Sequence, residues 1–121
     1  MKSRILFACQ VQLRTSMDLE TLGRLLSTTL LGGIPMGGRK EALLDEVPAI
    51  YTEGAILGNF FVLLGEPDEE GYYIRCLYDS ASFGVLSAEE IKACTVDISH
   101  PVARQLRTIP GIEILNPTDA S

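Results

Sequence analysis

The chain has 121 residues, 46% of them apolar and 21% charged, which suits one domain with a buried core and argues against disorder. Sixteen Asp and Glu residues outnumber ten Lys and Arg residues, and the formal net charge of -6 disfavours direct binding of nucleic acid or anionic lipid. A strongly charged partner is therefore expected to be basic. The three cysteines lack CxxC spacing and suit a reducing cytoplasm, and the apolar runs are too short to cross a membrane. We expect a cytoplasmic protein with no membrane partner.

The first third of the chain predicts a strand, a helix and a loop. Apolar and polar residues alternate over residues 5–13, as in a strand with one buried face. That face consists of Ile5, Phe7, Cys9, Val11 and Leu13. From Ser16 onward the apolar residues recur with the period of a helix. This predicts a helix with Ser16 or Asp18 as its N-cap and Gly32 as its C-terminal stop. The apolar face of this helix consists of Leu19, Leu22, Leu25, Leu26 and Leu30. Residues 32–40, with four glycines and a proline, are expected to form a loop.

The middle of the chain predicts a β-hairpin in an antiparallel sheet. Residues 50–53 and 58–64 have the aromatic and branched content of strands, and the apolar run over residues 60–64 predicts a central strand covered on both faces. Residues 65–71 have the composition of a turn. Residues 72–78 are expected to return as the antiparallel partner of the strand before the turn.

The last third of the chain predicts two helices and two short strands. Ser87 and Glu90 have the spacing of a capping box, which begins a helix. The remaining segments are expected, in order, to be a strand over residues 95–98, a helix over 99–109, a strand over 112–115 and a frayed tail over 116–121. In addition, a short helix is expected in the middle of the chain, over residues 41–47, where it ends before Pro48. The prediction is a single α+β domain over residues 1–121, with a mainly antiparallel sheet and two or three helices packed on it.

Charge is divided unevenly along the chain. Residues 41–74 contain eight acids and no base, whereas residues 1–40 contain six bases and two acids. Four of the eight acids lie in the predicted hairpin turn: Glu66, Asp68, Glu69 and Glu70. Two interpretations are open. The acids could solvate the surface, or they could form an acidic platform for a basic partner, with nearby tyrosines as anchors.

No pattern in the sequence predicts a catalytic, metal or cofactor site. His100 is the only histidine, and we expect it to be a surface or capping residue. Arg39 and Lys40 follow a glycine-rich segment, but they stand where a phosphate-binding loop needs Lys and Ser or Thr. The acids of the predicted turn lack the ligand spacing of a calcium loop. The cysteines are expected to be small buried hydrophobes: Cys9, Cys76 and Cys94.

In its size, acidity, α+β pattern and absence of a catalytic motif, the chain resembles the small immunity proteins that neutralise bacterial toxins. The resemblance implies a non-enzymatic inhibitor, monomeric or dimeric, that covers the active surface of a basic toxin domain such as a nuclease. Acids of this chain would then take the place of nucleic-acid phosphates, and Tyr73 and Arg75 would frame the contact. The expected partner-binding residues are Glu53, Glu66, Asp68, Glu69, Glu70, Tyr73 and Arg75.

Two other functions stay open at this stage. A small enzyme or ligand-binding domain would place its site between the sheet and the helices, and it would use Tyr51, Glu53, Arg75 and His100. A subunit of a larger assembly would use the strand over residues 60–64 or an exposed edge of the hairpin. Behaviour on purification separates these hypotheses, because a subunit would be insoluble or oligomeric alone, whereas an inhibitor would be soluble and bind one partner tightly.

Overall fold

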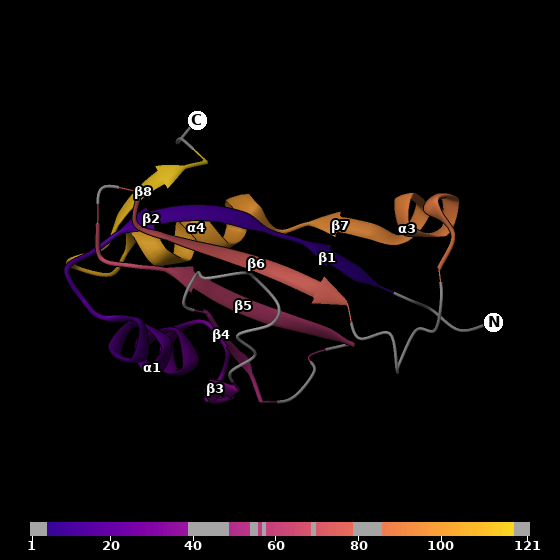
Figure 1. Cartoon of the computed structure of the whole chain (residues 1–121). Helices are drawn as coiled ribbons and strands as arrows, with labels where there is room; N and C mark the ends of the chain where they lie inside the picture. Colours follow the sequence, from indigo (N-terminus) through magenta and orange to yellow (C-terminus); the bar gives the residue numbers. More distant parts are fainter. Residues whose placement is uncertain are drawn as a thin grey trace.

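The computed structural model describes residues 5–38, 49–53, 56, 58–68, 70–78 and 86–117, which form two sheets and three helices (Figure 1). The larger sheet contains, in spatial order, β3 (Met36–Gly38), β4 (Ala49–Thr52), β5 (Asn59–Gly65), β6 (Tyr72–Tyr78), β2 (Gln10–Arg14) and β8 (Glu113–Asn116). Its neighbouring strands are all antiparallel. The smaller sheet pairs β1 (Leu6–Ala8) in parallel with β7 (Thr95–Asp97). The predicted α+β class is confirmed.

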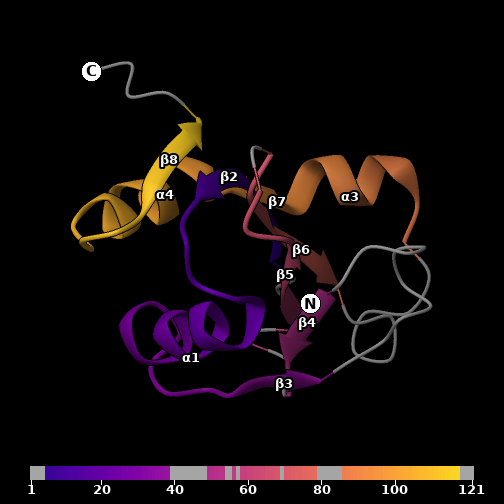
Figure 2. The same cartoon turned by 60° about the vertical axis from the view of Figure 1, so that its left-hand side comes forward.

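Helices lie on both sides of this strand layer. Figure 2 shows α1 (Leu19–Thr29) and α4 (Ser99–Arg107) on one side of the larger sheet and α3 (Ala88–Cys94) on the other. The main hydrophobic core lies between the larger sheet and the first two of these helices. Among the described residues, none of the helices has the length and apolar character needed to cross a membrane.

The predicted N-terminal strand divides at Cys9, because its two halves have different partners. Up to Ala8 the backbone pairs with β7, and the Ile98 N–H donates to the Ala8 carbonyl at 2.8 Å. The Gln10 N–H donates to Ser99 Oγ at 2.9 Å, and β2 then pairs with β6 and β8. At Cys9 the extended segment therefore changes partners. Before it, β1 pairs in parallel with β7, and after it, β2 pairs in antiparallel fashion with β6 and β8.

The predicted buried face is correct for β2 and wrong at Ile5, which lies just before β1. Val11 and Leu13 are fully buried in the main core. Ile5, however, is 40% exposed, and its neighbour Leu6 is buried in a second cluster with Leu86. The alternation predicts that the face with Ile5 is covered, but α3 covers the opposite face of β1, where Leu6 lies.

Helix α1 forms as the leucine spacing predicts, and Asp18 is its N-cap. The Asp18 carboxylate accepts a hydrogen bond from the Thr21 N–H at 2.8 Å, which satisfies one of the unpaired amides of the first turn. Leu22 and Leu26 are buried against the sheet. The helix ends before Gly32, as predicted.

The loop predicted for residues 32–40 is wrong over β3. Met36–Gly38 forms an edge strand that pairs with β4, and the register shifts between Met36 and Gly38. Glycine weakens a strand, but an edge strand of three residues needs only one neighbour and tolerates such an irregularity. Residues 39–40 and the helix predicted over residues 41–47 lie outside the described residues.

The predicted hairpin is confirmed. Strands β5 and β6 pair from Asn59 opposite Tyr78 to Gly65 opposite Tyr72, with the turn between them. β5 lies inside the larger sheet, and its residues 61–64 are all buried, as the apolar run predicts.

The helices and strands predicted for the last third of the chain are confirmed, with small shifts in their bounds. The capping box at Ser87 and Glu90 begins α3, β7 follows it, and α4 ends before Pro110. β8 begins at Glu113 and continues through Asn116, which is one residue into the segment expected to fray. The register explains this difference, because Asn116 pairs with β2.

Gly71, which closes the hairpin turn, is expected to be the least replaceable of the positive-φ glycines. Its φ is 74°, and a Cβ at this position would collide with the Leu13 carbonyl on β2. Gly71→Ala should lower the free energy of unfolding by about 1–3 kcal/mol, measured by urea denaturation. Gly111→Ala is the matched control, because Gly111 has a φ of 86° but nothing lies within 4 Å of its added Cβ. Equal losses in the two variants would contradict the steric explanation.

Candidate functional site

The hairpin turn between β5 and β6 presents three exposed carboxylates, those of Glu66, Asp68 and Glu70. The Asp68 carboxylate accepts a hydrogen bond from the Gly71 N–H at 2.9 Å, which holds the turn together. Glu69, also predicted to bind the partner, lies outside the described residues. Within the part of the chain that the structure describes, none of the three carboxylates forms a salt bridge.

A fourth acid, Asp18, comes to this turn from the start of α1. The buried Tyr72 Oη donates to the Met17 carbonyl at 2.8 Å, which ties the hairpin to the segment that precedes the helix. Burial raises the pKa of Tyr72, and the negative charges of Asp18, Asp68 and Glu66 raise it further, so these carboxylates lie around one tyrosine. We call Asp18, Glu66, Asp68 and Glu70 the acidic end.

Within the acidic end, Asp18 is held in its charged form at neutral pH. Hydrogen bonds from Thr21 hold the pKa of Asp18 below its usual value, because they stabilise the carboxylate form. Arg14 lies next to the turn, since its Cα would be 3.2 Å from a Cβ added at Gly71. Its guanidinium, however, pairs with Glu113 at 2.7 Å. The nearby base is therefore engaged by another acid.

Tyr73 and Arg75 extend the acidic end along the outer face of β6. They alternate with the buried Tyr72 and Ile74, which confirms that they lie on the hairpin face opposite the core. The Arg75 guanidinium carbon lies 5.6 Å from the centre of the Tyr73 ring, in a cation–π contact. Alongside them, Gln12 Nε2 donates to the Glu70 carbonyl at 2.8 Å.

Glu53 lies apart from the other predicted partner-binding residues. It follows β4, and its N–H donates to the Pro35 carbonyl at 2.9 Å. Ala49, at the other end of β4, pairs with Leu64 beside the hairpin turn. Glu53 is four residues further along the chain than Ala49, which is roughly 13 Å of extended backbone. The surface that carries Glu66, Asp68 and Glu70 therefore does not include Glu53.

The alternative site of Tyr51, Glu53, Arg75 and His100 is not assembled. Tyr51 and Arg75 lie on the outer face of the larger sheet, where Tyr51 makes an edge contact with Phe60, with ring centres 6.1 Å apart. His100 is exposed on α4, which packs on the opposite face. Residues on two faces of a sheet cannot act on one substrate.

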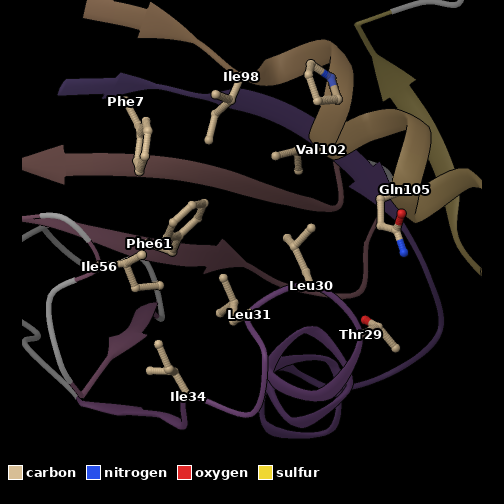
Figure 3. A pocket seen from close by; sticks show the side chains of 11 residues that line it. Phe7, Thr29, Leu30, Leu31, Ile34, Ile56, Phe61, Ile98, Val102 and Gln105 are labelled. Carbon is tan, nitrogen blue, oxygen red and sulfur yellow. The ribbon is translucent and has the colours of Figure 1, made fainter. Parts of the chain in front are cut away.

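A pocket does lie between the sheet and the helices, and it is apolar. Its volume is about 490 Å³, it is open to solvent, and residues of α1, α4, β1 and β5 contribute to its lining (Figure 3). Phe7 and Phe61 contribute aromatic rings with centres 6.3 Å apart. The aliphatic lining consists of Leu30, Leu31, Ile34, Ile56, Ile98 and Val102. The sequence alone did not predict this group of residues as a site, because they come from distant segments and each has the pattern of an ordinary core residue.

The cysteines and histidine form no reactive group in the described residues. A hydrogen bond with the Cys9 thiol, together with burial, raises the pKa of Cys76, so its thiol stays protonated at neutral pH. Cys94 donates its thiol proton to the Glu90 carbonyl at 2.8 Å. Among the residues with described positions, no three His, Cys, Asp or Glu side chains are grouped so that they could hold a metal ion.

Comparison of the chain with protein-family models, with curated proteins and with solved structures found no match. The features of this structure that bear on function are therefore the acidic end, the outer face of β6 and the apolar pocket.

Proposed function

We propose that this protein is a non-catalytic inhibitor of the immunity type, which binds a basic bacterial toxin domain through its acidic end. The observation that carries the proposal is the convergence of exposed carboxylates from two segments far apart in the sequence, Asp18 and the hairpin turn. Within the described residues, the turn carboxylates have no basic partner of their own. A basic protein would supply the missing positive charge.

The charge of the acidic end would affect both the rate and the specificity of binding. Several carboxylates on one exposed end create a local negative potential, which steers a basic partner during diffusion and aligns it on contact. For a nuclease, the surface that normally binds phosphates would face these carboxylates. The partner's substrate site would then be occluded without any reaction.

Tyr73 and Arg75 would supply the anchor beside this charged end. A tyrosine ring offers a large, rigid contact area with little loss of conformational entropy, and Arg and Tyr are enriched at interface hot spots. Arg75 already lies over the Tyr73 ring, so its side chain needs little further ordering on binding. Its positive charge would favour an acidic or carbonyl group at this edge of the partner.

Calorimetric titration of the product of the adjacent gene tests the proposal. If that product is a basic toxin domain, we expect a one-to-one complex that abolishes toxin activity, with an affinity that falls as ionic strength rises. Tight binding that ignores salt would place the interface away from the acidic end. Absence of binding, with both proteins folded, would contradict the proposal.

A further inference from the structure

We propose that Cys9 and Cys76 form a redox-modification site, whose two thiols join in a disulfide when the protein meets a small-molecule disulfide such as oxidised glutathione. The bond would hold β2 against β6 at the point where the N-terminal segment changes partners. This site shares no residue with the acidic end, so its oxidation is independent of the proposed inhibitor function.

The strand register places the two cysteines opposite each other. β2 and β6 are antiparallel, and their ladder pairs Gln10 with Arg75. Cys9 comes one residue before this pair on its strand and Cys76 one residue after it, so the same register continues to the two cysteines. Directly opposite residues of an antiparallel pair have Cα atoms about 4.5–5.5 Å apart. A disulfide needs a Cα separation of roughly 4.4–6.8 Å, so this position on the ladder suits one.

Both side chains lie on the core face of the sheet. Cys9 and Cys76 are each two residues from a fully buried core residue, Val11 on β2 and Ile74 on β6, and therefore point to the same side. Cys9 is buried in the main core, and the half-buried Cys76 packs against it. Their thiols are hydrogen-bonded to each other. Two sulfur atoms that already touch need little backbone movement to bond.

The third cysteine belongs to a different part of the structure. Cys94 lies on α3, and its thiol donates to the Glu90 carbonyl at 2.8 Å. It packs on the second cluster, beside Leu6 and Leu86, whereas Cys9 belongs to the main core. Figure 2 shows α3 on the opposite side of the larger sheet from α1 and α4, which cover that core. The packing therefore selects one pairing of the three cysteines.

The reaction is thiol–disulfide exchange, in which the external disulfide is the oxidant. Cys76, the less buried of the two, loses its proton, and its sulfur attacks the small disulfide, whose S–S bond breaks and releases one small thiol. The Cys9 sulfur loses its proton and attacks the Cys76 sulfur of this mixed disulfide, which releases the second small thiol. Two electrons and two protons pass from the protein to the small disulfide.

The environment of the pair makes this exchange slow. The hydrogen bond between the thiols, together with burial, raises the pKa of Cys76, so little thiolate is present at neutral pH. Because the thiolate is the attacking form, we expect oxidation over hours, and the pair is not a catalytic nucleophile.

Peptide mapping of the full chain after treatment with oxidised glutathione tests the pairing. Trypsin places each cysteine in a separate peptide, over residues 5–14, 76–92 and 93–104. We expect the first two peptides to be linked, in protein that runs as a single chain on a non-reducing gel, and the free thiols to fall from three to one. Absence of this linked peptide from folded protein, or linkage of either peptide to residues 93–104, would overturn the proposal.

Two single substitutions separate this pair from the third cysteine. Cys94→Ser should form the linked peptide at the wild-type rate, because its thiol takes no part in the exchange. Cys76→Ser replaces a half-buried thiol with a hydroxyl of similar shape and should form no link within the chain. A link between Cys9 and Cys94 in folded Cys76→Ser protein, or loss of the link in Cys94→Ser, would overturn the assignment.

Thermal unfolding measures whether the bond holds the two strands together. The disulfide closes the long loop from Cys9 to Cys76 and so restricts the unfolded chain. The oxidised protein should therefore melt roughly 5–15 °C above the reduced protein, whereas Cys76→Ser should show no such shift after the same treatment. An oxidised protein that melts at or below the temperature of the reduced one would overturn the proposed link between β2 and β6.

Discussion

Reversing two carboxylates of the hairpin turn, by Glu66→Lys with Glu70→Lys, is expected to weaken binding of the basic partner roughly tenfold or more. Both side chains are exposed, and each reversal replaces an attraction with a repulsion. Most of the loss should appear as slower association at low salt, since long-range steering depends on the net potential of this end. Stopped-flow association and calorimetry at two ionic strengths would measure it. Asp68 is left unchanged, because its carboxylate accepts the hydrogen bond from Gly71 that shapes the turn.

The control for this experiment is a second double reversal, Glu53→Lys with Glu89→Lys. It changes the net charge of the protein by the same amount, and both side chains are exposed. Glu53 lies at the far end of β4 from the turn, and Glu89 lies on α3. The control should alter the affinity only slightly. Equal weakening by both double variants would assign the effect to overall charge and would remove the acidic end as the binding site.

Asn59→Ala is expected to lower the free energy of unfolding by about 3–5 kcal/mol. Asn59 is fully buried, and its side-chain amide forms the two hydrogen bonds that the backbone of a neighbouring strand would otherwise form. Its Oδ1 accepts from the Phe7 N–H at 3.1 Å, and its Nδ2 donates to the Ile5 carbonyl at 2.9 Å. Removing the amide leaves a backbone donor and a backbone acceptor of the N-terminal segment without their partner and adds a cavity. Urea denaturation would measure the loss.

Thr52→Val is the comparison for this variant. Thr52 is also fully buried, but its hydroxyl accepts a single, longer hydrogen bond, from the Phe61 N–H at 3.3 Å. Valine has nearly the same shape and leaves no cavity, so the expected cost is that of one buried N–H without its acceptor, about 1–2 kcal/mol. If Asn59→Ala cost no more than Thr52→Val, the amide would not be the link between β5 and the segment at β1.

Local patterns in the sequence were sufficient for the elements near the candidate site. The turn composition of residues 65–71 and the apolar runs beside it predicted β5 and β6, and the leucine spacing predicted α1 with Asp18 as a possible N-cap. These features depend on residues only a few positions apart, such as the Asp18 carboxylate and the Thr21 N–H. The alternation along β6 puts Tyr73 and Arg75 on the outer face, opposite the buried Tyr72 and Ile74.

Tertiary pairing decided which of these residues become neighbours. Asp18 joins the hairpin acids because Tyr72 bonds to Met17, whereas Glu53 is carried away from them by the length of β4. Sequence distance predicted the opposite grouping, since Glu53 belongs to the acidic middle segment and Asp18 does not.

The apolar pocket likewise forms only because segments that are distant in the sequence pack together. Phe7, Leu30, Phe61 and Val102 each have the pattern of a core residue, and nothing local distinguishes a residue that fills a core from one that lines an opening. The sequence by itself determined the secondary structure and the faces of most elements, because hydrogen-bonding and burial periods act over a few residues. Which helix covers which strand, and where a gap is left between them, depends on long-range packing, and only the tertiary structure decided it.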